Sequence, residues 1–122
     1  MLVLDGVSAF YGKIQALNHI SLRVEEGEIV TMVGANGAGK STTLMTICGS
    51  PRARTGNIKF GKQDITNHPT FEIVRLGLSH APEGRRVFSR MTVYENLQMG
   101  GVVGSPRNFA ADINMVFELF PI

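Results

Sequence analysis

Hydrophobic and polar residues alternate along the first part of the chain in the pattern of half-buried strands. Between residues 20 and 25, isoleucine, leucine and valine alternate with serine, arginine and glutamate, which predicts a strand with one buried face. Residues 2–9 predict an earlier strand that ends at a turn over 11–13. After a second turn at 25–28, residues 29–33 are almost wholly apolar, which is typical of a strand covered on both faces.

Glycine and proline divide the middle of the chain into short elements. Residues 54–56 predict a turn before a short strand over 57–60. A proline in the first turn and a glycine after the last one predict a helix over 69–76. Residues 78–81 predict another short strand, which Pro82-Glu83-Gly84 breaks into a basic loop.

Helical patterns dominate the end of the chain. Thr92 and Glu95 have the spacing of a capping box, which predicts a helix that stops near Gly100. A last helix is predicted after Gly104-Ser105-Pro106. Its apolar residues recur at helical spacing, and they are Phe109, Ile113, Val116, Phe117 and Phe120. This apolar face requires a partner surface.

The composition is that of one globular domain. The chain has 122 residues, of which 43% are hydrophobic and 18% charged, so it can bury a core and is not disordered. The net charge is only +2, but between residues 52 and 90 eight basic residues stand against three acidic ones. A basic stretch suits nucleic acid, lipid headgroups or another protein. No aromatic-interleaved RNA motif accompanies it, so a solvated face is favoured over nucleic-acid binding.

Cysteine usage and the absence of long apolar runs favour the cytosol. Cys48 is the only cysteine, which fits a reducing compartment and a small hydrophobic role in a helix. No run approaches the ~20 apolar residues that span a bilayer. The first residues do not have the pattern of a signal peptide. We therefore expect a soluble protein of the cytosol.

The strongest local signal is a segment that fits GxxxxGK[ST] in full, namely Gly34-Ala35-Asn36-Gly37-Ala38-Gly39-Lys40-Ser41. Its glycines allow successive N–H groups to converge on phosphate oxygens, and a helix predicted over 40–48 places its N-terminal dipole at the same point. Lys40 supplies a charge for the β- and γ-phosphates, and the Ser41 hydroxyl can ligate Mg²⁺. The segment predicts a nucleoside-triphosphate site.

Further motifs resemble one family of nucleotide-binding proteins. Tyr11-Gly12, Glu26-Gly27-Glu28 and the segment 34–42, in this order, resemble the ATP-binding subunits of ABC transporters. Residues 82–88, PEGRRVF, and 91–97, MTVYENL, resemble the branched-chain amino acid branch, in its LivF-type subunit. The resemblance implies an α/β P-loop NTPase fold, that of the ABC ATPase nucleotide-binding domain. Residues 1–122 would be its N-terminal portion, with an antiparallel β segment and the start of the helical subdomain.

The resemblance also implies a role for each matching residue. Lys40 and Glu83 would be catalytic, and Ser41 and Glu83 would hold Mg²⁺. Glu83 stands where most of the family has glutamine, and a solvated loop glutamate is the alternative. Residues 85–91 would line a groove for a helix of the membrane subunit. The residues implied in ATP binding are Tyr11, which would stack on adenine, and Gly34, Ala35, Asn36, Gly37, Ala38, Gly39, Lys40, Ser41 and Thr42.

The function that the resemblance implies is ATP-driven import of branched-chain amino acids, with ATP and Mg²⁺ as cofactors. The partners would be transmembrane permease subunits and a second ATP-binding subunit, in a homo- or heterodimer, and nucleic acid would not be a partner. The protein would be cytoplasmic and peripheral on the inner face of the cell membrane.

Two alternatives remain open at this stage. Urea, another amide or another amino acid could be the cargo, because near relatives share the loop at 82–86. The chain also lacks the family's LSGGQ-like segment and a strand ending in Asp-Glu, so the C-terminal half of the domain is absent from it. We therefore expect these 122 residues alone to be inactive as an ATPase, and a truncated, non-hydrolysing nucleotide-binding module is the second alternative.

Overall fold

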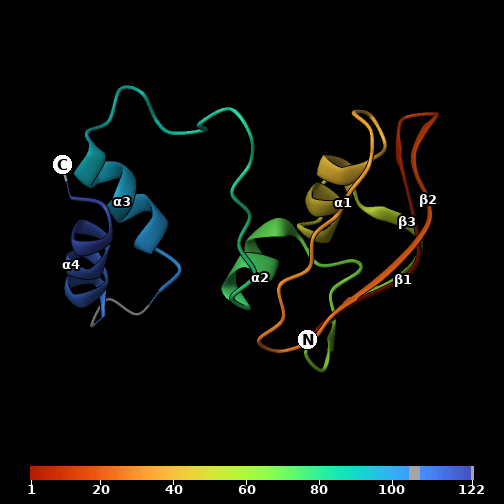
Figure 1. The fold of residues 1–122 in the computed structure, drawn as a ribbon, viewed down its shortest axis with the longest axis horizontal. Coiled ribbons are helices and arrows are strands. Elements are labelled where there is room, and N and C mark those ends of the chain that lie inside the picture. Colours follow the sequence, from red (N-terminus) through yellow and green to blue (C-terminus); the bar gives the residue numbers. More distant parts are fainter. Residues whose placement is uncertain (105–107, 122) are drawn as a thin grey trace. The chain divides into compact units, whose positions relative to one another are not determined.

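A computed structural model describes residues 1–104 and 108–121, and the chain divides into two compact units, residues 1–80 and 81–122. The first unit is built on a four-stranded antiparallel sheet in the order β2-β1-β3-β4 (Figure 1). Its strands are β1 (Leu2–Tyr11), β2 (Ile14–Val24), β3 (Ala53–Phe60) and β4 (Gln63–Asp64). The two strands predicted over 2–9 and 20–25 are confirmed as β1 and β2, and both are longer than expected.

The centre of the sheet is irregular because β1 and β3 approach each other at two glycines. The register pairs Leu4 with Ile58, then shifts between Asp5 and Ser8. Gly56 has φ +81°, and a Cβ built on it would lie 2.5 Å from the Asp5 carbonyl oxygen and would also collide with the backbone of Gly6. Only glycine fits this approach. Residues 54–56 therefore do not form the predicted turn; they lie inside β3, where the glycine permits a bulge.

Two helices of the first unit, α1 (Lys40–Ile47) and α2 (Thr70–Arg75), pack on one face of the sheet (Figure 1). Both were predicted, and each ends before a glycine of positive φ, Gly49 and Gly77. The core that joins the helices to the sheet consists of Leu4, Val7, Ile47, Ile58, Ile65 and Ile73. Cys48, at the end of α1, is half-buried, and burial raises the pKa of its thiol. Through Ile47, this core packs α1 against the sheet and so fixes its position.

Two predicted strands do not form. Residues 29–33 have no regular secondary structure, and the side chains of Ile29 and Val33 are 94% and 93% exposed. Residues 78–81 are likewise irregular. An apolar strand of a parallel sheet requires hydrogen-bonded neighbours on both sides. The four strands among the described residues pair only with one another, so the backbone of these two segments has no strand to join.

The second unit contains two helices, α3 (Val93–Gly101) and α4 (Phe109–Leu119). The predicted capping box is present at the start of α3. Tyr94 and Phe109 pack edge to face with ring centroids 6.5 Å apart, which holds the two helices together. The apolar face predicted for the last helix is only partly covered, because Ile113 is buried whereas Phe117 and Phe120 remain exposed. Ser105 and Pro106, after which we expected the last helix, lie outside the described residues.

The capping box makes the stability of α3 depend on pH. The Thr92 amide and hydroxyl both donate to the Glu95 carboxylate, at 2.7 and 3.0 Å, and these bonds lower the pKa of Glu95. Because the unfolded chain then takes up the proton at a higher pH, the stabilisation is complete at neutral pH and is lost as the pH falls through the lowered pKa. Thr92→Ala removes the hydroxyl bond and keeps the amide bond. We expect it to raise the Glu95 pKa part of the way to its ordinary value in an NMR titration; an unchanged pKa would contradict the hydroxyl's role.

Of the helices in the described part of the chain, none is long and apolar enough to cross a membrane.

Candidate functional site

The glycine-rich loop of the first unit leads directly into α1. Residues 34–39 have no helix or strand, and Gly39 is the N-cap of α1 with φ +90°. A Cβ on Gly39 would lie 2.9 Å from the Leu17 Cδ2 atom and 3.3 Å from the Ala16 carbonyl oxygen. Gly39 therefore fits because it has no side chain, and the end of the loop lies directly against β2.

The N-terminus of α1 offers an anion-binding surface. Thr43 closes the first helical turn, since its amide donates to the Gly39 carbonyl at 2.8 Å and its hydroxyl does the same at 2.8 Å. The amides of Lys40, Ser41 and Thr42 precede this bond, so they have no acceptor within the helix. Free amides together with the helix dipole favour a phosphate group at this position.

Lys40 is folded back over the loop. Its Nζ atom donates to the carbonyl oxygens of Gly34 at 2.5 Å and Ala35 at 2.8 Å. The ammonium group is therefore held against the loop backbone in front of α1, within reach of an anion at the helix N-terminus. Phosphate oxygens can replace these two neutral acceptors, and they form the stronger, charge-assisted bonds.

The β1–β2 hairpin carries Tyr11 beside this loop. Ala9 pairs with Leu17, the residue that Gly39 contacts, and Tyr11 is two residues further along β1. Because a strand rises about 3.4 Å per residue, Tyr11 lies about 7 Å along β1 from Ala9. Tyr11 is 47% exposed, so part of its ring is accessible to a ligand. The predicted aromatic residue and the predicted phosphate loop therefore lie in one part of the first unit.

Arg54 stabilises the same hairpin, and sequence reasoning had given it no role. Its guanidinium carbon lies 4.0 Å from the centroid of the Phe10 ring, and its Nη2 atom donates to the Gly12 carbonyl at 3.1 Å. The arginine thus connects β3 to the residues on either side of Tyr11. No sequence pattern signals this contact, because it depends on the pairing of β1 with β3.

The predicted metal ligands belong to different units. Ser41 is exposed in the first turn of α1, beside Lys40, and its hydroxyl would be available as a ligand of Mg²⁺. Glu83 is exposed in an irregular loop of the second unit. Its participation in the same site stays a prediction. Within residues 1–104 and 108–121, no group of three histidine, cysteine, aspartate or glutamate side chains could hold a metal ion.

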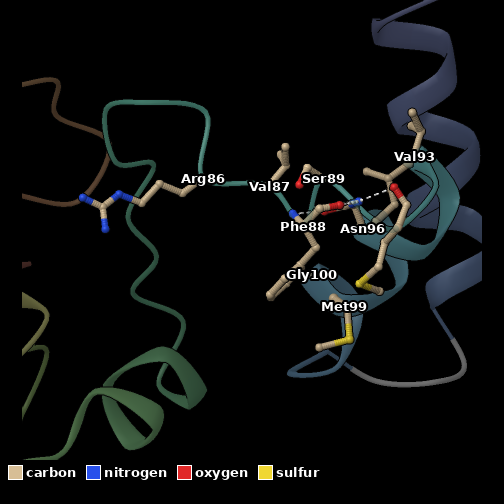
Figure 2. Close-up of a pocket in the computed structure, with 10 residues that line it drawn as sticks. Arg86, Val87, Phe88, Ser89, Val93, Asn96, Met99 and Gly100 are labelled. Atoms are coloured by element: carbon tan, nitrogen blue, oxygen red, sulfur yellow. Dashed lines mark hydrogen bonds between the residues drawn. The ribbon is translucent and has the colours of Figure 1, made fainter.

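The second unit contains an apolar groove of about 820 Å³ (Figure 2). The predicted docking segment 85–91 supplies one side of it, and α3 supplies the other. Figure 2 shows that the Arg86 side chain points away from the other labelled residues, so it lies at the edge of the groove. The lining residues are Arg86, Val87, Phe88, Ser89, Met91, Val93, Asn96, Leu97, Met99 and Gly100.

Sequence reasoning missed the contribution of α3 to this groove. Val93, Asn96, Leu97 and Gly100 follow the i, i+3, i+4, i+7 spacing of one helix face, and this signal was available in the sequence.

Comparison with known proteins identifies the family. Residues 17–122 match the ABC transporter family, and the chain belongs to it. It is 52% identical over 121 residues to the high-affinity branched-chain amino acid transport ATP-binding protein BraG of Pseudomonas aeruginosa, covering 99% of this chain and 52% of that protein. It is 40% identical over 93 residues to the probable branched-chain amino acid transport ATP-binding protein LivG of Archaeoglobus fulgidus, covering 76% of this chain and 36% of that protein. The chain thus spans about half the length of its Pseudomonas relative, or less for the other.

Solved structures confirm the predicted fold class. An ATP-binding subunit of an ABC transporter superposes with a TM-score of 0.83 and 25% identity, covering 97% of this chain and 49% of that one. A nucleotide-free ATP-binding cassette from an ABC transporter gives a TM-score of 0.74 and 32% identity, covering 89% of this chain and 44% of the other. The fold is that of the N-terminal portion of an ABC ATP-binding cassette.

Proposed function

We propose that this chain is the nucleotide-binding part of an ATP-binding subunit that powers import of branched-chain amino acids. The observation that carries the proposal is the loop 34–39 at the N-terminus of α1, with the Lys40 ammonium folded over it. The cargo is proposed from the relatives, whose names describe branched-chain amino acid transport. The site of action is the cytoplasmic face of the membrane, where the subunit works with permease subunits and a second ATP-binding subunit.

Each residue of the site has a proposed task. The amides of residues 40–42 and the Lys40 ammonium hold the phosphates, and the ammonium moves from the carbonyl oxygens of Gly34 and Ala35 to do so. The Ser41 hydroxyl and the Glu83 carboxylate would be the protein ligands of Mg²⁺. Mg²⁺, when bound, neutralises charge on the phosphate oxygens. Hydrolysis requires further groups from other segments or subunits, because a clamp and a base are needed around the γ-phosphate.

Uptake in cells tests the cargo. In a strain that lacks the native gene, the complete ATP-binding subunit that contains these residues should restore uptake of labelled leucine, and the same subunit with Lys40→Ala should not. Uptake of labelled urea should be the same with the wild type and with Lys40→Ala. Restoration of urea uptake alone would replace the proposed cargo with an amide. Restoration of neither would favour the non-hydrolysing binding module.

Tyr11→Ala tests the adenine contact. The exposed ring supplies a stacking face, so its removal should weaken ATP binding by about 1–3 kcal/mol. Binding of tripolyphosphate, which has no base, should be unchanged. Calorimetric titration with both ligands measures the two effects, and Tyr11→Phe, which keeps the ring, is the matched control. Equal losses for both ligands would show that Tyr11 only supports the hairpin.

Charge reversal at Arg85 and Arg86 tests the groove as the docking site of the permease. The groove lining includes Arg86 and no acidic side chain, so a partner segment with an apolar face and an acidic end fits it. Replacing both arginines by glutamate should reduce co-purification with the permease about tenfold. ATP affinity should be unchanged. Loss of ATP binding with intact assembly would contradict this assignment.

A further inference from the structure

The Asn96 side chain forms four hydrogen bonds to the loop that precedes its own helix. Its Oδ1 atom accepts from the Phe88 amide at 2.8 Å, and its Nδ2 atom donates to the Phe88 carbonyl at 3.1 Å (Figure 2). Nδ2 also donates to the carbonyls of Met91 at 3.3 Å and Thr92 at 2.9 Å. One amide side chain therefore connects α3 to both ends of the segment 88–92.

This segment has few other bonds to fix it. Residues 81–91 contain no helix or strand, and every side chain among them is exposed except the half-buried Met91. Of the backbone bonds in the described structure, those within 85–91 are Val87 N–H to Arg85 C=O and Met91 N–H to Phe88 C=O. The Phe88 amide donates to Asn96, and the Phe88 carbonyl accepts from both Asn96 and the Met91 amide. Apart from the two backbone bonds, the described hydrogen bonds that hold residues 85–91 come from the Asn96 side chain.

The segment is also the apolar side of the groove. Val87 and Phe88 are 66% and 57% exposed, so core packing does not orient them. Asn96 holds the backbone of Phe88 directly, and Val87 is the neighbouring residue in the chain. A groove whose side is fixed before binding loses less conformational entropy when a partner enters it.

We infer that Asn96 is a positioning residue for permease docking: it holds residues 88–92 so that Val87 and Phe88 face the partner before contact. This inference rests on the proposed docking role of the groove. The amide group is specifically suited to the task, since it offers an acceptor to the Phe88 amide and two N–H donors that the carbonyls of Phe88, Met91 and Thr92 share. An alanine offers neither, and an aspartate offers only the acceptor.

Hydrogen exchange and assembly, measured on the complete protein and its permease, test the inference together. Asn96→Ala should speed exchange of the Phe88 amide about tenfold or more and weaken assembly about tenfold, with unchanged affinity for MgATP. Asn96→Asp should keep the Phe88 amide protected and retain part of the assembly. Gln98→Ala is the matched control, because the Gln98 side chain is an exposed amide on the same helix and makes none of the described hydrogen bonds. It should change neither the exchange of the Phe88 amide nor the assembly with the permease.

The outcomes separate the inference from the function on which it rests. Unchanged exchange at Phe88 in Asn96→Ala would overturn the positioning role and leave the docking site untouched. Faster exchange with wild-type assembly would show that the groove does not receive the permease. A loss of MgATP affinity equal to the loss of assembly would show that Asn96 supports the whole fold, which also overturns the inference.

Discussion

Replacing Lys40 by alanine should reduce the affinity for ATP about 100-fold, because hydrogen bonds to a charged group contribute about 1.5–3 kcal/mol each. The ammonium group is already folded over the loop that precedes α1, on the carbonyls of Gly34 and Ala35. Those carbonyls can accept from water once the side chain is gone, so the variant should fold normally. Calorimetric titration with MgATP measures the affinity, and thermal unfolding monitors the fold.

Lys62→Ala is the matched control for this variant. Lys62 lies in the exposed turn between β3 and β4, away from the glycine-rich loop in the sequence. Because it is also a lysine, its replacement by alanine changes the net charge by the same amount. We expect its ATP affinity to equal that of the wild type. Similar affinities for all three proteins would exclude the loop 34–41 as the phosphate site.

Gly56→Ala should have the largest effect on stability. A Cβ at this position would meet the Asp5 carbonyl oxygen at 2.5 Å and collide with the Gly6 backbone, and neither can move without breaking the pairing of β1 with β3. The positive φ of +81° adds backbone strain for alanine. We therefore expect the free energy of unfolding to fall by more than about 4 kcal/mol, which places the variant among the most destabilising single substitutions. Urea denaturation followed by circular dichroism measures the change in the free energy of unfolding.

Gly61→Ala separates the collision from the backbone strain. Gly61 has φ +59°, but nothing lies within 4 Å of a Cβ built on it. Its substitution should cost only about 1–2 kcal/mol from the left-handed conformation. If both variants lost the same stability, the close approach of β1 and β3 would not be the cause.

Local signals predicted the elements of the fold that depend on local interactions. The capping box of Thr92 and Glu95 and the helix at Lys40 involve residues within one or two turns, so the sequence contains all of their determinants. The strand predicted over 29–33 failed for the opposite reason. An apolar run becomes a strand only where neighbouring strands supply hydrogen-bond partners, and among the described strands none pairs with it.

The site divides along the same line. The glycine-rich loop and Lys40 were predicted, because the residues of the motif and the start of the helix are contiguous in the sequence. Arg54 and Asn96 were not, since the first depends on pairing between β1 and β3 and the second on the return of a loop to its own helix. Gly56 illustrates the same limit, because a glycine after two polar residues indicates a turn locally and here permits a bulge.

The most direct test of the central claim, that this chain binds MgATP through the loop at the N-terminus of α1, is an NMR titration of the ¹⁵N-labelled protein with MgATP. The amides of residues 37–42 should shift in a saturable manner, together with that of Tyr11, and the amides of β4 should not. Saturable binding that leaves residues 37–42 unshifted, or no binding at millimolar MgATP, would contradict the assignment of this loop as the nucleotide site.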